Sequence, residues 1–234
     1  MASPSDRTRR PLRGEKSERR VESLLVVARE VFAERGYEKA TALEIAQRLG
    51  VSEATVFSYF GGKRDLCLEV IRRWYDEISS HLEGELPAID GMRSKLHFVI
   101  RRHLTHLIGE GAGICALVLG EGRVADSAFK EEIAVMKRRY VKTLMSAFQE
   151  ARQRGEMRSD VGANLFRDMV YGSMEHVLWD FVASGRKPDI EKTASQLTDL
   201  LWRSFAPVDV DTSRLLRFHA DVVAAVRRSE LPAT

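Results

Sequence analysis

Apolar residues recur at three- and four-residue steps along most of this 234-residue chain, which is the period of an amphipathic helix. The first stripe begins near Ser17 and ends at Gly36, and its apolar positions are Val21, Leu24, Leu25, Ala28, Val31 and Phe32. The sequence contains neither strand-like alternation nor Asn-Gly hairpin signals. We therefore predict an all-α protein.

Two short helices joined by a tight turn are predicted after this stripe. Thr41 offers a hydroxyl as N-cap, and Glu44 follows three residues later, which is the pattern of a capping box. Gly50 provides the backbone freedom that a sharp turn needs, and Ser52 is placed to cap the next helix. This order is typical of a helix-turn-helix, whose second helix lies in the DNA major groove.

The rest of the chain continues as helical stripes. After the glycine pair 61–62 we predict a long helix over 63–82, a connection over 84–91, and helices over 92–109, 114–121, 127–154, 160–184 and 190–206. A further apolar stripe predicts a last helix over 211–228. These elements divide the chain into a basic arm (1–16), a helix-turn-helix domain (17–63), a helical domain (64–206) and an extension (207–234).

The composition narrows the class of protein. Apolar residues make up 44% of the chain and charged residues 30%, as in globular proteins with a core. The longest apolar run, 114–119, is far shorter than the roughly 20 residues of a membrane-spanning helix, and no secretory signal is expected. Cys67 and Cys115 lie in apolar surroundings, so we expect buried thiols in a reducing cytoplasm rather than a disulfide.

Positive charge is concentrated at the N-terminus. Residues 1–20 carry seven basic and three acidic side chains, whereas the whole chain has a net charge of +3, so the remainder is close to neutral. A basic arm on a near-neutral body suits contact with a polyanion such as DNA. The alternative is a solvated tail with no partner.

The second helix of the predicted helix-turn-helix supplies the candidate DNA contacts. Its outward positions carry side chains short or polar enough to approach base edges, namely Glu53, Ala54, Thr55, Phe57 and Ser58. Phosphate contacts are expected from groups at helix starts and flanks, namely Thr41, Ser52, Tyr59 and Lys63. Structural alternatives remain open, since Thr41 could act only as a cap, Tyr59 could pack on the first helix, and Thr55 could be plain helix surface.

A known family shares this pattern. Residues 41–66 follow T-x-x-x-I-A-x-x-L-G-V-S-x-x-T-x-[FY]-x-Y-F-x-x-K-x-x-L. Together with the long first helix, this resembles the TetR family of bacterial one-component transcriptional regulators over about residues 17–75. Phe57 stands where the family more often has tyrosine, and the pair Gly61-Gly62 replaces residues that are more often polar or proline.

The resemblance implies a homodimer formed through the last two main helices. The expected interface residues are Phe166, Val170, Ser173, Val177 and Phe181 in one stripe and Leu197, Leu200, Leu201 and Phe205 in the other. The alternative is that one stripe fills the subunit's own core. A dimer would place two recognition helices about 34–36 Å apart, the spacing of successive major grooves on a palindrome.

The resemblance also implies a small-molecule pocket in the helical domain. Candidate apolar lining residues are Leu104, Leu107, Ile108, Leu117, Val118, Met136, Tyr140, Leu144 and Trp179, and candidate polar ones are Glu175 and His176. They could equally be ordinary core. The segments LVLGEGRVADSAF and YGSMEH are similar to those of family members that respond to fatty acyl-coenzyme A thioesters.

The implied function is a ligand-responsive repressor that a small hydrophobic effector releases from a double-stranded palindromic operator. A constitutive or nucleoid-type DNA-binding protein with a protein partner is one alternative, and a transcriptional activator is another.

Catalytic and metal sites find little support in the sequence. His97, His103 and His106 lie on one predicted helix without a nearby cysteine or carboxylate to complete a tetrahedral metal site. Phosphate-loop, G-x-S-x-G and H-E-x-x-H motifs are missing from the sequence. We therefore expect neither a cofactor nor an enzyme, although a helical enzyme built around the histidines would be detected by its bound metal.

Overall fold

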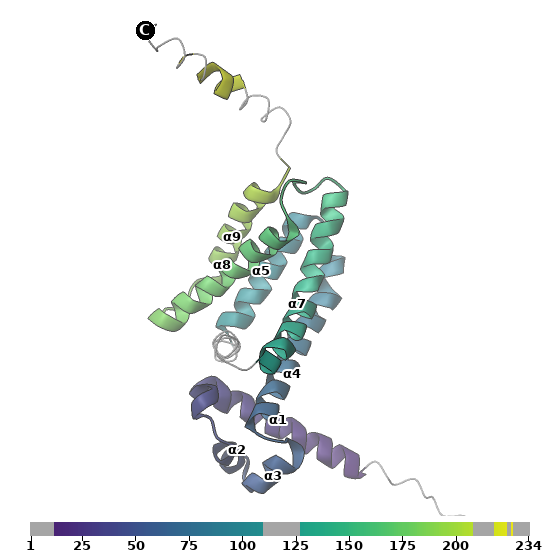
Figure 1. Ribbon diagram of the computed structural model, residues 1–234, viewed down its shortest axis with the longest axis vertical. Helices are drawn as coiled ribbons and strands as arrows, with labels where there is room; N and C mark the ends of the chain where they lie inside the picture. The colour runs from purple at the N-terminus through teal and green to yellow at the C-terminus, as the bar shows by residue number, and fades with distance from the viewer. Residues whose placement is uncertain (1–11, 110–126, 208–217, 224–225, 227–234) are drawn as a thin grey trace, which may run out of the picture.

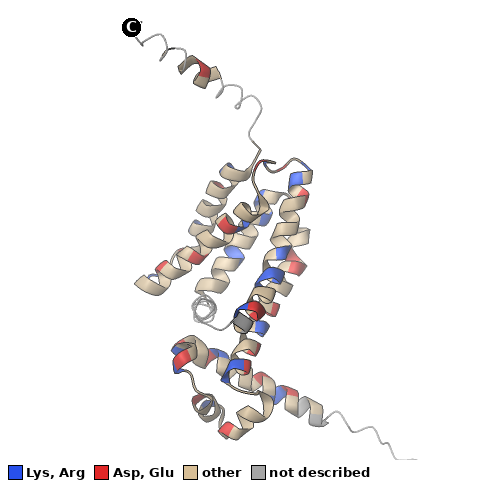
Figure 2. Cartoon of the chain, in the orientation of Figure 1, with Lys and Arg blue, Asp and Glu red and all other residues tan. Residues whose placement is uncertain are grey.

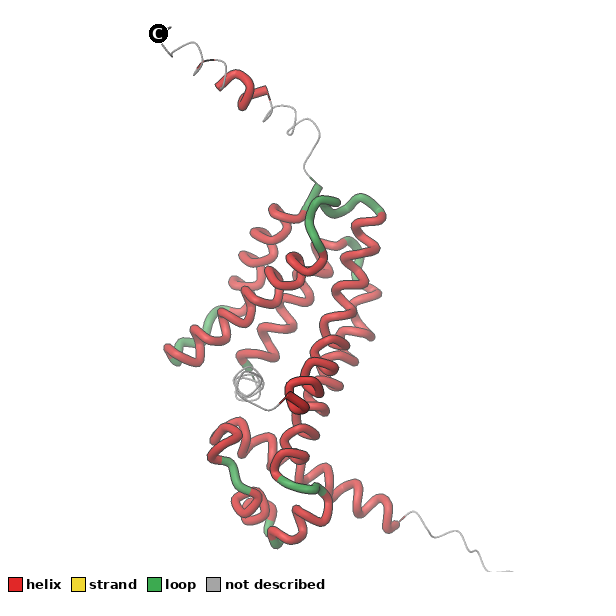
Figure 3. The backbone as a smooth tube through the Cα atoms, viewed as in Figure 1, coloured by secondary structure: helices red, strands yellow, loops and turns green. Residues whose placement is uncertain are grey.

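The computed structural model describes residues 12–109, 127–207, 218–223 and 226. Within these ranges every regular element is a helix (Figure 3), which confirms the all-α prediction. The arm over 1–11 and the helix predicted over 114–121 lie outside the described residues. Of the predicted last helix, residues 218–223 and 226 are described, and they are helical.

Three helices form a head at one end of the molecule (Figure 1). They are α1 (Leu12–Lys39), α2 (Ala42–Leu49) and α3 (Glu53–Tyr59). The predicted start near Ser17 is wrong, because α1 already begins at Leu12, whereas the predicted end of its long first stretch at Gly36 is confirmed. Gly36 has a non-helical backbone (φ 72°, ψ 172°) inside α1. Glycine adopts this conformation at low cost, so Gly36 ends the first helical stretch, and a short second stretch follows it up to Lys39.

Local capping interactions set the geometry of α2 and α3. The Thr41 hydroxyl accepts a hydrogen bond from the Glu44 N–H at 3.1 Å, and the Ser52 hydroxyl accepts one from the Thr55 N–H at 3.2 Å. Gly50 closes α2 in the left-handed region (φ 70°, ψ 34°). The second half of the predicted capping box is not formed, because the Glu44 carboxylate turns instead to Arg48.

The larger domain is built from α4 (Lys63–Glu85), the 3₁₀ turn η1 (Leu86–Ala88), α5 (Met92–Ile108), α7 (Ser127–Gln153), α8 (Ala163–Ser184) and α9 (Ile190–Phe205). Figure 1 shows α4 running from the head into this domain, where it lies beside α7. α8 and α9 lie on the opposite side of α5. None of the helices in the described ranges is long and apolar enough to cross a bilayer.

The core of this domain contains residues that the sequence placed on a dimer surface. Phe166 stacks on Phe148 with ring centroids 4.1 Å apart and meets Phe205 edge-on at 5.1 Å. Phe166, Val170, Leu201 and Phe205 are almost fully buried within one protomer. For these four the interface prediction is wrong, because these stripes of α8 and α9 face α5 and each other.

The thiol of Cys67 is buried in α4, as expected, whereas Cys115 lies outside the described residues.

Candidate DNA-binding head and effector cavity

The outer face of α3 is the candidate surface for DNA. Phe57 and Tyr59 are 46% and 37% exposed, whereas Val56 is buried against the head core. Glu53, Ala54 and Ser58 are exposed, and Thr55 is half-buried. Glu53 is the only charged residue in α3 (Figure 2), so this helix offers DNA mainly neutral polar and aromatic groups.

The hydroxyl groups of the N-cap Ser52 and of Thr55 and Ser58 in α3 already make local hydrogen bonds. The Ser52 and Thr55 hydroxyls lie 2.8 Å apart, and the Ser58 hydroxyl donates to the Thr55 carbonyl at 2.7 Å. These bonds fix the start and the pitch of the helix. Glu53, Phe57 and Tyr59 are the exposed residues of α3 whose side chains make no such bonds and carry a charge or a ring, among the described residues. Glutamate and phenylalanine each have a known preference among base edges.

Lys63 connects α4 to the end of α1. Its ammonium group donates to the Tyr37 carbonyl at 2.9 Å and to the Glu38 carbonyl at 3.3 Å, and it lies 4.4 Å from the centre of the Tyr37 ring. An ammonium has three N–H donors, so one remains for a phosphate oxygen. The predicted phosphate contact stays a prediction, and the structure adds a positioning role that the sequence did not suggest.

Ionic interactions hold α2 against α1. Arg48 donates to both Glu34 oxygens at 3.1 and 2.7 Å and to Glu44 at 2.7 Å, and Arg35 donates to Glu44 at 3.3 Å. The hydrogen bond from Arg48 holds the pKa of Glu44 below its ordinary value, and Arg35 adds to the effect. The network braces the helix that supports α3.

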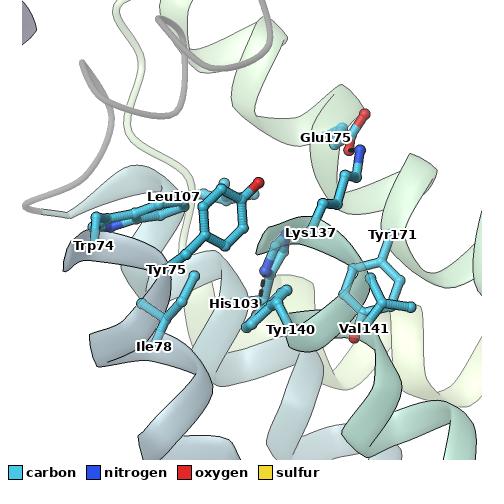
Figure 4. A pocket seen from close by; sticks show the side chains of 10 residues that line it. All are labelled: Trp74, Tyr75, Ile78, His103, Leu107, Lys137, Tyr140, Val141, Tyr171 and Glu175. Carbon is cyan, nitrogen blue, oxygen red and sulfur yellow. Dashed lines mark hydrogen bonds and ion pairs between the residues drawn. The ribbon is translucent and has the colours of Figure 1, made fainter. Parts of the chain in front are cut away.

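A small cavity lies inside the larger domain, between four helices (Figure 4). α4 contributes Trp74, Tyr75 and Ile78, and the other lining residues are His103, Leu107, Lys137, Tyr140, Val141, Tyr171 and Glu175. Its free volume is about 30 Å³, roughly the share of one water molecule in the liquid. The walls are mostly apolar and aromatic, and a few polar groups are set among them.

Burial keeps two polar residues of this cavity, His103 and Tyr171, in their neutral forms. His103 Nδ1 lies 2.5 Å from the Tyr140 hydroxyl. Burial, with smaller effects from His106 and Lys137, lowers the pKa of His103 to about 3. Burial also raises the pKa of Tyr171 above its ordinary value. The Tyr171 hydroxyl is buried and has no hydrogen-bond partner among the described residues.

The predicted effector residues are only partly brought together. Leu107, Tyr140 and Glu175 line the cavity. Leu104, Ile108 and Leu144 are buried in the core but do not line it, Met136 and Trp179 are half-buried elsewhere, and His176 is exposed. Leu117 and Val118 lie outside the described residues. The predicted effector residues include none of those that α4 contributes to the cavity, although Trp74 and Ile78 belong to the apolar stripe of that helix.

The head and the cavity are physically connected through α7. Phe129, in the first turn of α7, holds its ring 6.2 Å from that of Tyr37. The Arg64 guanidinium lies 5.7 Å from the Phe129 ring. The Glu132 carboxylate forms ion pairs with Arg64 at 4.0 Å and with Arg72 at 3.4 Å. The same helix carries Lys137, Tyr140 and Val141 to the cavity wall.

The three histidines of α5 have separate environments. His97 Nδ1 lies 3.2 Å from the Thr198 hydroxyl, His103 meets Tyr140, and the His106 ring lies parallel to that of His81 at 6.4 Å. Across the described residues, no group of three or more His, Cys, Asp or Glu side chains is placed to hold a metal ion.

An exposed recognition helix on a helix-turn-helix, joined to a helical domain with an internal cavity, defines a one-component DNA-binding regulator. The chain belongs to the tetR family of bacterial regulatory proteins. The family model of these proteins matches residues 24–70, and that of the YsiA-like protein, C-terminal region, matches residues 72–204. The protein is therefore a ligand-responsive, DNA-binding transcriptional regulator.

The similar proteins are transcriptional regulators, and one of them is named for fatty acid metabolism. The chain is 24% identical over 178 residues to the fatty acid metabolism regulator protein of Bacillus subtilis (strain 168), covering 76% of this chain and 91% of that one. It is 36% identical over 97 residues to the HTH-type transcriptional activator FasR of Mycolicibacterium smegmatis, covering 42% and 44%. The crystal structure of FadR from Bacillus subtilis in complex with stearoyl-CoA has the same fold, with a TM-score of 0.71 and 23% identity, covering 77% and 96%.

Proposed function

We propose that this regulator is a repressor that leaves a palindromic operator when a fatty acyl-coenzyme A thioester binds in the cavity between α4, α5, α7 and α8. A relative from Bacillus subtilis is named a fatty acid metabolism regulator, and the similar crystal structure of FadR from Bacillus subtilis contains stearoyl-CoA. The mostly apolar and aromatic lining of the cavity supports an acyl chain as the bound group.

The position of α4 between the cavity and the head is the observation that supports effector control of DNA binding. α4 supplies Trp74, Tyr75 and Ile78 to the cavity wall, and its first residue, Lys63, is hydrogen-bonded to the end of α1 in the head. The free volume of about 30 Å³ is far below the roughly 300–1,000 Å³ of typical ligand sites. An acyl chain therefore enters only if the surrounding helices separate, and a displaced α4 moves the head.

The energetic requirement is modest. The effector must bind the conformation with displaced heads more tightly than the DNA-binding one. A typical coupling of about 1–3 kcal/mol changes operator affinity roughly 5–150-fold, which is enough to release the operator.

An exposed apolar surface supports a homodimer. Leu165 and Met169 of α8 are 56% and 47% exposed, and Leu200 of α9 is 64% exposed. A Cβ added at Gly172, which is exposed on the same face of α8, meets no atom within 4 Å, so a second helix can approach closely there. Of the predicted interface residues, Leu200 belongs to this surface, and Ser173, Val177, Phe181 and Leu197 are half-buried beside it.

Selection of bound duplexes from a random DNA pool tests this function. We expect a palindrome with half-sites about one helical turn apart and release of the selected duplex by palmitoyl-CoA. The proposal fails if no sequence is enriched at low ionic strength. It also fails if the selected duplex stays bound at saturating palmitoyl-CoA.

An activator is the second candidate, because one similar protein is named an activator. A promoter–reporter assay in a deletion strain separates the two: loss of a repressor raises expression, whereas loss of an activator lowers it. Either role places the protein in the cytoplasm with its operator, and neither requires a cofactor or catalysis.

A further inference from the structure

Two histidines face each other between α4 and α5. His81 of α4 and His106 of α5 hold their rings parallel, with the ring centres 6.4 Å apart. His81 is exposed and His106 is half-buried. Neither lines the inner cavity, although His106 directly precedes Leu107 of the cavity wall. The pair therefore joins α4 to α5 by a contact that is separate from the cavity.

The charged groups around His106 leave no carboxylate for a proton on its ring. The described groups whose charges act on it are Arg29 of α1, Glu77 and His81 of α4, and Arg102 of α5. Glu77 already forms an ion pair with Arg29 at 3.6 Å, and Arg102 forms one with Glu85 at 3.2 Å. A protonated His106 would therefore add a cation that neither carboxylate is free to neutralise.

The buried side of the His106 ring also favours its neutral form. Its Nε2 atom is buried and has no hydrogen-bond partner among the described residues. A neutral imidazole leaves one ring nitrogen without a proton, whereas an imidazolium carries N–H groups on both nitrogens. A buried N–H group of a cation is costly when it has no acceptor. Burial and, after it, Arg102 lower the pKa of His106 below its ordinary value of 6.5.

α4 is the helix whose position depends on this contact. Its backbone packs mainly against α7 and α1, so its approach to α5 relies on side chains such as the histidine pair. Separation of α4 from α5 opens the His106 ring to water, which accepts hydrogen bonds from both N–H groups of an imidazolium. The separated conformation therefore binds a proton more readily than the closed one, and acid favours separation.

We propose that the His81–His106 pair is a proton-sensitive contact, through which mild acid separates α4 from α5 and weakens operator binding without an effector. The inference goes beyond the proposed function, because it requires neither an acyl chain nor the inner cavity. α4 carries the displacement to the head through Lys63, which is hydrogen-bonded to the end of α1. The response begins as the pH falls below about 6.5, where a histidine in water takes up its proton.

The distribution of histidines makes this response measurable. All six histidines of the chain lie within residues 81–219, and residues 1–80 contain none. Histidine is the side chain whose ordinary pKa places its charge change between pH 5 and 8. The charge of the DNA-binding head therefore stays nearly constant between about pH 7.5 and 5.5, and a loss of affinity in this range originates in the larger domain.

Fluorescence anisotropy with the selected operator, at constant ionic strength and without any acyl compound, tests the inference. From about pH 7.5 to 5.5 we expect the wild type to lose about fivefold in affinity, within the limit of about tenfold per pH unit for one proton. His106→Gln should keep its affinity across this range. His97→Gln is the matched control, because His97 is a histidine of the same helix that meets Thr198 of α9, and it should keep the wild-type loss.

Two further measurements separate the role of the pair from a loss of structure. Circular dichroism and thermal unfolding of each variant at both pH values confirm that the fold is retained. His81→Gln changes the exposed member of the pair. It should reduce the loss of affinity, because it removes one of the groups that disfavour a proton on His106.

Three results would overturn the inference. They are an equal operator affinity of the wild type at both pH values, a full loss of affinity in His106→Gln, and a loss that His103→Gln abolishes but His106→Gln does not. Each of them leaves the acyl effector standing, because no acyl compound is present. An operator complex that ignores palmitoyl-CoA but dissociates in mild acid, with His106→Gln resistant, would refute the acyl effector and support the histidine contact.

Discussion

Tyr37 at the end of α1 and Phe129 in the first turn of α7 hold their rings 6.2 Å apart with a tilt of 54°. On one side of this contact, the ammonium group of Lys63 lies over the Tyr37 ring and donates a hydrogen bond to the Tyr37 carbonyl. On the other side, α7 continues to Tyr140 in the cavity wall. A movement of α7 therefore reaches the head directly, in addition to the route through α4.

The variant Phe129→Leu should uncouple the two domains. Leucine keeps the site apolar but removes the aromatic contact with Tyr37 and the cation–π contact with Arg64. We expect the change in operator Kd caused by palmitoyl-CoA to shrink by about fivefold or more, while effector affinity changes little. Phe148→Leu is the control, since Phe148 is a buried phenylalanine of the same helix that stacks on Phe166, away from the head. Equal coupling in the two variants would argue against this contact.

Lys63→Ala should have two separable effects. It removes hydrogen bonds to the Tyr37 and Glu38 carbonyls, so thermal stability should fall. If Lys63 also contacts a phosphate, the slope of log K for DNA binding against log salt should decrease in magnitude by about 0.9. A loss of stability with an unchanged slope would leave Lys63 only its positioning role.

Phe57 should read a thymine methyl group. Its ring is nearly half exposed on α3, and an apolar side chain recognises the C5-methyl group of thymine in the major groove. Replacing each operator thymine in turn with uracil should reveal a position where the wild type loses about 0.8 kcal/mol of binding free energy, the contribution of one buried methyl-sized group. Phe57→Ala should lose affinity for the thymine duplex and become indifferent to uracil there. If every uracil duplex binds both proteins as the parent does, this contact is excluded.

The stability of the protein should fall in mild acid because of His103. Its pKa is about 3 when buried and 6.5 in its ordinary state, so between these values the unfolded chain binds one more proton than the native one. Stability then decreases as the pH is lowered through this window, by about 1.4 kcal/mol per pH unit. Between pH 7 and 5, urea unfolding should show about 2 kcal/mol more loss for the wild type than for His103→Gln. Parallel losses would show that His103 is not held neutral.

Tyr171→Phe should stabilise the protein without effector. The Tyr171 hydroxyl is buried without a hydrogen-bond partner among the described residues, and such a group costs about 1–3 kcal/mol. Because burial raises its pKa, the hydroxyl remains a donor, and the carbonyl of a bound thioester can accept from it. The expected result is a higher Tm together with weaker palmitoyl-CoA binding. A lower Tm would indicate that the hydroxyl already has a partner.

Features fixed by neighbouring residues could be predicted from the sequence. The caps at Thr41 and Ser52 and the turn at Gly50 depend on a few consecutive residues, and the structure confirms all three. The end of the first helical stretch at Gly36 is equally local, because glycine adopts a positive φ at low cost, and the structure confirms it as well.

Features that depend on the arrangement of helices could not be predicted. α8 carries apolar residues on two faces, so periodicity alone could not decide whether Phe166 or Leu165 points inward. The cavity draws residues from four helices, and Trp74 and Tyr171 resemble ordinary core residues in a sequence.

Hydroxyl-radical footprinting of the selected operator, with and without palmitoyl-CoA, tests the central claim most directly. If two α3 helices read adjacent major grooves and an acyl effector displaces them, protection should appear as two patches about one helical turn apart and should disappear when the effector is added. Uniform or absent protection, or a pattern that palmitoyl-CoA leaves unchanged, would contradict effector-controlled operator binding.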